Sequence, residues 1–213
     1  MRARVRALTV GDVVPVAAGP GLEAVGSPTL PTTLARLDDG LLKHLKLAEG
    51  WRDIIEAAAG AHGFRPCVIA GIGSRESGWG LLLEPPGPAG TGDGGHGRGL
   101  MQIDDRSFPE FCAGEEWKDP EPNVGFGCEV LAEKRAYIRK RLILGADDEL
   151  RATVAAYNCG QGNVLKVLAR GEDVDARTTH KDYSRDVLDR AGWFGMHGWA
   201  WATRVKEPRE VPS

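Results

Sequence analysis

The sequence predicts a mostly helical α+β fold with a small β element near residues 90–104. Several stretches after residue 35 carry apolar residues at spacings of three and four, the period of an amphipathic helix. Between two of them lies EPPGPAGTGDGGHGRG (84–99), whose glycines and prolines exclude a helix. A chain of 213 residues that is 42% hydrophobic suits one compact domain with its own core.

Composition divides the chain into three parts. Residues 1–34 are rich in Gly, Pro, Val and Thr and show no sustained helical period, so we expect an N-terminal arm or linker, with a short strand at Val13–Ala17. Residues 35–195 carry the helical periodicity and are predicted to form the folded domain. The period is lost over residues 196–213, which are predicted to be a C-terminal tail.

The first two helices are predicted from their apolar faces. The first ends at His62-Gly63 and carries on one face Leu47, Trp51, Ile54, Ile55 and Ala58. The second opens at Pro66, where a missing N–H costs nothing, and runs to about Gly78. It is apolar on every side and is therefore expected to be buried. Its glycines, Gly71 and Gly73, are expected to admit another backbone at close range.

The remaining elements follow the glycine-rich stretch, and most have a start or stop signal. They are a short strand at 100–104, a helix from Pro122 or Asn123 to about Leu144, a helix capped by Asp147 or Asp148 and broken by Gly160 and Gly162, a short helix over Val164–Leu168, and a last helix starting at Thr179 with Asp182 three residues later.

Charge and hydropathy exclude two classes of protein. Lys and Arg total 27 against 30 acidic residues, a net charge of −3, so no nucleic acid is expected as a partner. The chain has no uninterrupted run of about 18 apolar residues, so no membrane span is expected. The basic N-terminus resembles a signal peptide, but Gly11, Asp12 and Pro15 interrupt its apolar stretch, so we do not interpret it as one.

The four cysteines are scattered and form no CxxC pair, and no His lies at zinc-finger spacing. A structural metal site is therefore not expected. Two interpretations stay open for the four residues: free buried thiols, or one or two disulfides in an oxidising compartment. The residues are Cys67, Cys112, Cys128 and Cys159.

Glu76 is the first candidate catalytic residue. It lies near the end of the apolar helix, and Ile69 and Ile72, seven and four positions earlier, share its face. A carboxyl on an apolar face loses hydration, which raises its pKa toward the value that a general acid needs near neutral pH. Alternatively, Glu76 points to solvent at the helix end or pairs with Arg75.

The second candidate stretch contains Asp93 in the glycine-rich loop and Asp104 after Gly99-Leu-Met-Gln-Ile. Asp93 alone fits an ordinary turn residue as well as a functional one. The run Gly90-x-Gly92-x-x-Gly95 matches a dinucleotide fingerprint, but prolines precede it instead of a strand and no βαβ unit follows. Carboxylates with His96 do not have the i, i+4 spacing of a helical metal-ligand pair.

The third stretch is Ala155-Ala-Tyr157-Asn158-Cys-Gly160-Gln-Gly162, a helix end followed by two glycines. It places a phenol and an amide at a helix terminus. The plain alternative is an ordinary C-cap with a core tyrosine.

Together the three stretches resemble the goose-type lysozymes, relatives of the soluble lytic transglycosylase domains. The resemblance covers roughly residues 35–195, and the order and spacing of its short motifs make it specific. The motifs are Ile-Ala-Gly-Ile-Gly-Ser-Arg-Glu-Ser (69–77), Gly-Leu-Met-Gln-Ile-Asp (99–104), Ala-Ala-Tyr-Asn-x-Gly-x-Gly-Asn-Val (155–164), Thr-Thr-His-x-Asp-Tyr (178–183) and Asp186-Val187.

The resemblance implies a lysozyme-like fold with a cleft between two lobes, and hydrolysis of the β-1,4 bond between N-acetylmuramic acid and N-acetylglucosamine. The family's general acid matches Glu76, and its two water-holding aspartates match Asp93 and Asp104, which implies inversion. No cofactor or metal is expected, and a monomer acting on peptidoglycan or a chitin-like oligosaccharide, secreted or released by lysis, is the expected form. The family's sugar cleft is lined at positions that match Gln102, Tyr157 and Asn158.

The chain departs from the family at two places. Extra residues, including Pro85, Pro86 and Pro88, separate Glu76 from Asp93, and Glu133-Lys134 stands where the family has an Asn-Phe sugar contact. Two other functions stay open. One is a lytic transglycosylase, which uses the same Glu without a water-activating carboxylate; the other is a non-catalytic wall-binding module that keeps the fold.

Overall fold

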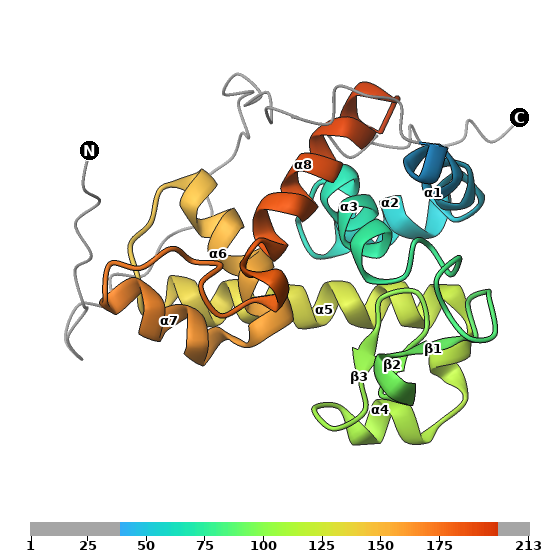
Figure 1. Ribbon diagram of the computed structural model, residues 1–213, viewed down its shortest axis with the longest axis horizontal. Coiled ribbons are helices and arrows are strands. Elements are labelled where there is room, and N and C mark those ends of the chain that lie inside the picture. Colours follow the sequence, from blue (N-terminus) through green and yellow to red (C-terminus); the bar gives the residue numbers. More distant parts are fainter. Residues whose placement is uncertain (1–38, 200–213) are drawn as a thin grey trace, which may run out of the picture.

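The computed structural model describes residues 39–199, which form a helical body with a small three-stranded sheet at its lower end (Figure 1). The helices are α1 (Asp39–Gly50), α2 (Arg52–Ala61), α3 (Pro66–Glu76), α4 (Pro109–Ala113), α5 (Pro120–Arg139), α6 (Ala146–Cys159), α7 (Gln161–Ala169) and α8 (Tyr183–Met196). Short 3-10 helices cover Asp93–Gly95, Glu116–Lys118 and Thr179–Lys181. The predicted mostly helical α+β class is confirmed.

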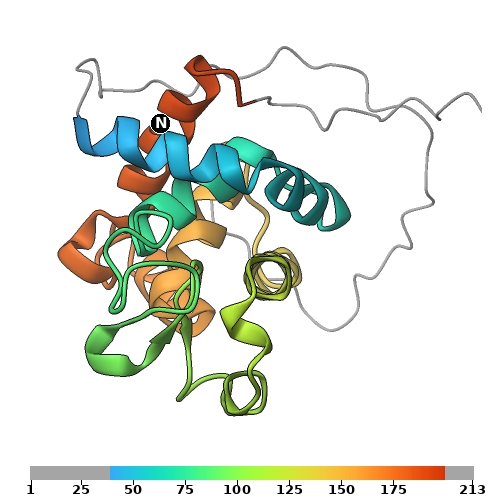
Figure 2. The ribbon, with the colours of Figure 1, turned by 90° about the vertical axis from the view of Figure 1, so that its right-hand side faces the viewer.

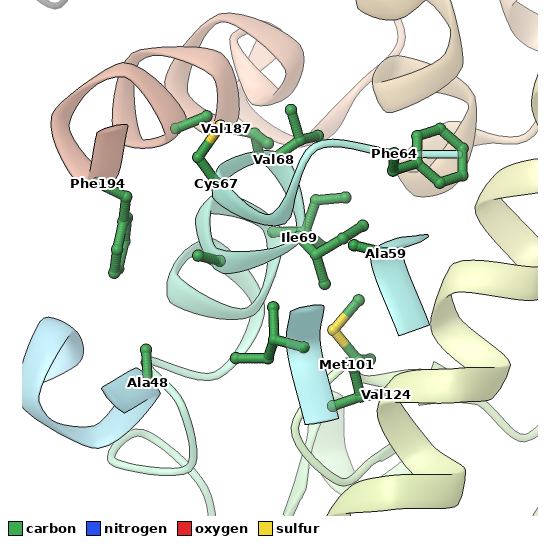
Figure 3. Close-up of a cluster of buried hydrophobic side chains, with 14 of the residues drawn as sticks. Ala48, Ala59, Phe64, Cys67, Val68, Ile69, Met101, Val124, Val187 and Phe194 are labelled. Carbon is green, nitrogen blue, oxygen red and sulfur yellow. The ribbon is translucent and has the colours of Figure 1, made fainter. Parts of the chain in front are cut away.

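Helix α3 is the core of the molecule, as its all-round apolar sequence predicts. Pro66 is at its first helical position, and every residue from Pro66 to Ser74 is buried. A Cβ on Gly71 would meet the Val187 carbonyl oxygen of α8 at 2.6 Å, so this glycine admits the α8 backbone as expected. For Gly73 the expectation is wrong, because its neighbour is the ring of Trp79 and not another backbone. Figure 3 shows Ile69 of α3 in the middle of this core, between the side chains of α8 and Met101.

The sheet is antiparallel, with strand order β1 (Thr91–Gly92), β2 (Gly97–Arg98) and β3 (Ile103–Asp104). It lies where the sequence predicts a β element, but β3 is shorter than the expected strand over 100–104. Leu100 and Met101 are fully buried in a turn instead, where they anchor the sheet to the core. Both views of the molecule place the sheet and α4 at the end opposite the C-terminus of α8 (Figures 1 and 2).

Asn123 joins the long helix α5 to the sheet. It lies fully buried inside α5, accepts a hydrogen bond from the Met101 N–H at 2.9 Å and donates to the carbonyls of Arg98 at 3.1 Å and Trp117 at 3.0 Å. These bonds satisfy backbone groups of strand β2, of the turn before β3 and of the 3-10 helix Glu116–Lys118. One buried side chain thus holds α5 and the sheet together.

Several helix boundaries differ from the prediction. The first predicted helix is two helices, α1 and α2, because the chain turns at Trp51. Helix α5 starts at Pro120, where the Asp119 side chain caps it, and ends at Arg139 rather than near Leu144. Helix α4 was not predicted.

The later helix starts differ too. Asp147 and Asp148 do not cap α6. They lie in its first turn, where negative charge favours the helix N-terminus. Gly160, with φ +81°, ends α6, whereas Gly162 lies inside α7. Thr179 opens a 3-10 turn instead of the last helix, which begins at Tyr183.

The packed region continues past residue 195. Helix α8 ends at Met196, and Trp199 is fully buried, edge-on to Phe194 at 5.8 Å and beneath the Arg52 guanidinium at 4.2 Å. Trp199, which the sequence analysis assigned to the tail, is therefore part of the core. The arm over 1–34 and its strand at Val13–Ala17 lie outside the described residues, and the division of the chain stays a prediction.

All four cysteines are free thiols, with Cys67 and Cys128 buried and Cys112 and Cys159 partly buried. The structure therefore agrees with free thiols and not with disulfides, the other interpretation that the sequence left open. None of the helices within residues 39–199 is both long and apolar enough to cross a membrane.

Candidate active site

A cleft of about 820 Å³ runs between the sheet and the helical body. One wall comes from the end of α3, a second from β1–β3 and the turn after β3, and a third from the end of α6 and the start of α8. All six residues singled out in the sequence line this cleft. They are Glu76, Asp93, Gln102, Asp104, Tyr157 and Asn158.

Glu76 is the last residue of α3, so the most buried helix delivers its carboxyl directly to the cleft. Ile69 and Ile72 on the same helix are fully buried. The surrounding protein removes hydration from the carboxyl, and this burial raises the pKa of Glu76 to about 7, even though a hydrogen bond from the Tyr183 hydroxyl and the charge of Arg75 act in the opposite direction. A carboxyl with this pKa holds a proton near neutral pH and can donate it.

Arg75 does not pair with Glu76. Its guanidinium turns to α8, where it bonds Asp186 at 2.8 Å and Asp182 at 3.1 Å. Asp186 also accepts from Arg190 at 2.7 Å. These ion pairs fix the end of α3 against α8, which positions Glu76 and Tyr183 toward each other.

The two aspartates share one arginine. Arg106 bonds Asp93 at 2.8 Å through Nη2 and Asp104 at 2.7 Å through Nε, and the Ser107 hydroxyl donates to the other Asp104 oxygen at 2.7 Å. Partial burial raises the pKa of Asp104, but the bonds from Ser107 and Arg106 outweigh it and hold the pKa below its ordinary value. Asp104 is therefore an ionised carboxylate and a weak base, suited to orienting a polar ligand or water.

The glycines of the loop make room for Gln102. A Cβ on either Gly92 or Gly97 would collide with the Gln102 carboxamide oxygen, and the amide donates to the Gly99 carbonyl at 2.8 Å. Gln102 itself has φ +51°, a strained conformation for a residue with a side chain. Of the three glycines that imitate a dinucleotide fingerprint, Gly92 makes room for Gln102, whereas Gly90 lies against the Pro85 carbonyl.

Tyr157 and Asn158 tie the end of α6 to the rest of the cleft. The Tyr157 hydroxyl donates to the Met101 carbonyl at 2.8 Å, and the Asn158 carboxamide oxygen accepts from the Thr179 N–H at 2.9 Å. Both side chains line the cleft, so each combines a structural bond with a surface open to a ligand. Their role in binding sugar stays a prediction.

His96 lies beside carboxylates but outside the cleft lining. Its Nδ1 is 2.8 Å from Asp105, which also accepts from Arg98 at 2.8 Å. Within residues 39–199, no group of three or more His, Cys, Asp or Glu side chains is arranged to hold a metal ion.

Sequence reasoning missed three residues of the cleft as functional candidates. Tyr183 ends the Thr-Thr-His-x-Asp-Tyr motif, but the sequence analysis assigned no chemical role to its hydroxyl. Arg106 follows Asp104 by two positions, a spacing that suggests a local ion pair. Lys134 was noted as a departure from the family, and it lines the cleft from α5.

A cleft lined by one carboxyl that keeps its proton near neutral pH and by two further carboxylates is typical of glycoside hydrolases. The chain belongs to the lysozyme g family, whose model matches residues 34–198. Membership in this family supports the muramidase class that the sequence predicts.

Three lysozymes g illustrate the similarity. The chain is 39% identical over 135 residues to that of Dromaius novaehollandiae, a match that covers 63% of this chain and 60% of the relative. It is 34% identical over 168 residues to the protein of Casuarius casuarius, covering 75% of this chain and 84% of the relative. It is also 34% identical over 168 residues to that of Gallus gallus, covering 78% and 71%. The matched region thus spans three fifths of the first relative's length.

Proposed function

We propose that this protein is a peptidoglycan hydrolase that cleaves the β-1,4 bond between N-acetylmuramic acid and N-acetylglucosamine. The observation that carries the proposal is the position of Glu76, whose pKa burial raises to about 7, in a cleft that also holds Asp93 and Asp104. The printed name of the matched relatives, lysozyme g, supports the same activity. We further propose that the enzyme acts as a monomer.

Glu76 acts as the general acid. Its carboxyl donates a proton to the glycosidic oxygen as the bond breaks, and positive charge develops on the sugar ring. The Tyr183 hydroxyl hydrogen-bonds one carboxyl oxygen and stabilises the carboxylate that remains after proton transfer. Burial keeps the proton on Glu76 before the reaction, and Tyr183 limits the cost of losing it.

Asp93 and Asp104 hold the attacking water. Arg106 joins the two carboxylates into one unit, and each oxygen that already accepts one bond can accept another from water. The low pKa of Asp104 favours orientation of the water over complete removal of its proton. Attack by a water held on the face away from the leaving group inverts the anomeric carbon.

A variant and a product analysis test the proposal. Glu76→Gln should retain the fold and lose nearly all release of reducing ends from purified cell walls, since an amide has no proton to give. Activity within about tenfold of wild type would contradict the assignment of Glu76, and a wild-type protein that binds walls without cleaving them would be a non-catalytic module.

The product distinguishes hydrolysis from the transglycosylase alternative. An anhydro-muropeptide is lighter than the hydrolysis product by one water, so mass spectrometry separates the two. We expect the hydrolysed product, and we expect the double variant Asp93→Asn with Asp104→Asn to lose far more activity than either single variant. An anhydro product together with full activity of the double variant would show that water takes no part.

A further inference from the structure

Lys134 occupies a position on α5 that faces the protein interior. Val130 lies four residues before it and Ile138 four residues after it, and both side chains are buried. Because residues four apart share a helix face, the pattern calls for an apolar residue at this position. Lys134 is instead half-buried and lines the cleft that holds Glu76.

Aromatic rings support the Lys134 side chain. Its Nζ lies 5.7 Å from the centre of the Phe108 ring, which is edge-on to Phe126 at 5.3 Å, and Phe126 in turn stacks on Phe111 at 4.0 Å. A lysine commonly buries its aliphatic stem against apolar groups while its ammonium reaches a polar space. Burial of Lys134 lowers its pKa, opposed by the charge of Glu133, so the ammonium is partly stripped of water.

The arginines of the cleft are already paired. Arg75, Arg106 and Arg190 each form an ion pair with an aspartate side chain. Lys134 differs, since the ion pairs formed among residues 39–199 do not include its ammonium. The cleft therefore holds a partly desolvated cation whose charge is available to a ligand.

We propose that Lys134 binds a carboxylate of the glycan strand and makes this cleft favour muramic-acid-containing strands over chitin. The inference rests on the proposed peptidoglycan substrate. Chitin has no carboxylate. Peptidoglycan carries one on the lactyl ether of N-acetylmuramic acid where the peptide is absent, and others within the peptide stem where it is present. A hydrogen bond between an ammonium and a carboxylate is strongest where water is excluded from both.

Binding measurements in the Glu76→Gln background test this without interference from cleavage. The ligands are a chitin hexasaccharide, glycan strands stripped of peptide, and intact uncross-linked strands. Adding Lys134→Met keeps the length of the stem and removes the charge. We expect it to raise the dissociation constant for a carboxylate-bearing strand about tenfold more than that for the chitin hexasaccharide, and Lys134→Arg to restore most of the loss.

The two carboxylate sources give different patterns. If Lys134→Met selectively weakens binding of stripped strands, Lys134 binds the lactyl carboxylate. If it selectively weakens binding of intact strands alone, Lys134 binds a carboxylate of the peptide stem. Lys140→Met, at an exposed position at the end of α5, is the matched control and should leave all three dissociation constants unchanged. Thermal unfolding of each variant verifies that it folds.

The inference would be overturned if Lys134→Met weakened all three ligands by the same factor or weakened none. Its failure is distinguishable from failure of the proposed function. If wild-type protein cleaves no strand but the binding pattern is as expected, the muramidase proposal fails and the carboxylate site stands. If wild-type protein cleaves walls and the binding pattern is absent, the reverse holds.

Discussion

Glu76→Gln should stabilise the fold against unfolding at pH 8 relative to pH 4, although it removes the proposed catalytic acid. Burial raises the pKa of Glu76 from an ordinary value of 4.5 to about 7. Between these two pH values the folded protein binds the proton and the unfolded chain has released it. The stability that protonated Glu76 gives the wild-type protein is therefore fully present below about pH 4.5 and is lost as the pH rises through 7. The glutamine side chain does not titrate, so the variant shows no such loss.

The size of the effect follows from the same pKa values. A rise from 4.5 to about 7 corresponds to a free energy of about 3 kcal/mol, and because Glu76 opens to the cleft, solvent screening reduces this to roughly 1–3 kcal/mol. The Tyr183 hydroxyl can still donate to the glutamine carbonyl, so the variant keeps the hydrogen bond. At each pH, the free energy of unfolding of the wild type is subtracted from that of the variant. The measured quantity is this difference at pH 8 minus this difference at pH 4.

Urea unfolding followed by tryptophan fluorescence at pH 4, 6 and 8 gives this quantity, since the titrations of all other groups cancel between the two proteins. Asp104→Asn serves as a control of opposite sign. Because Ser107 and Arg106 hold the pKa of Asp104 low, its stabilisation is present above the pKa of the unfolded chain and is lost as the pH falls. A Glu76→Gln difference that does not change with pH, or that grows toward low pH, would refute the desolvation argument.

Two further predictions concern single side chains. Tyr183→Phe should raise the pKa of Glu76 further, because it removes the bond that stabilises the carboxylate, and should move the alkaline limb of the kcat/KM profile to higher pH. Tyr157→Phe is the control, because the Tyr157 hydroxyl bonds the Met101 carbonyl, and it should not move the alkaline limb in this way. An alkaline limb that moves to lower pH in Tyr183→Phe would contradict the role of Tyr183. Asn123→Ala should lower the free energy of unfolding by about 2–4 kcal/mol, since it removes two buried hydrogen bonds and one partly buried hydrogen bond to backbone groups. A loss under about 0.5 kcal/mol in urea titration would show that water replaces the amide.

The sequence determined the helical class and the environment of Glu76. Both depend on local spacing: a helix apolar on every side must be buried, and Ile69 and Ile72 lie on the Glu76 face wherever that helix packs. The raised pKa of Glu76 could be predicted for this reason. Helix ends were less accurate, because Trp51 fits an apolar face equally well within one helix or at the turn between two.

Only the tertiary structure decided which side chains meet. The Tyr183 hydroxyl reaches Glu76 from 107 positions along the chain, because α8 packs against α3 at Gly71. The contact between Gln102 and the glycines at 92 and 97 exists only in the folded sheet. The place of Lys134 in the cleft, beside the Phe108 ring, likewise depends on how α5 packs. Periodicity records whether a residue is buried, whereas partners across a cleft depend on how the elements pack, which the spacing of residues within one segment does not encode.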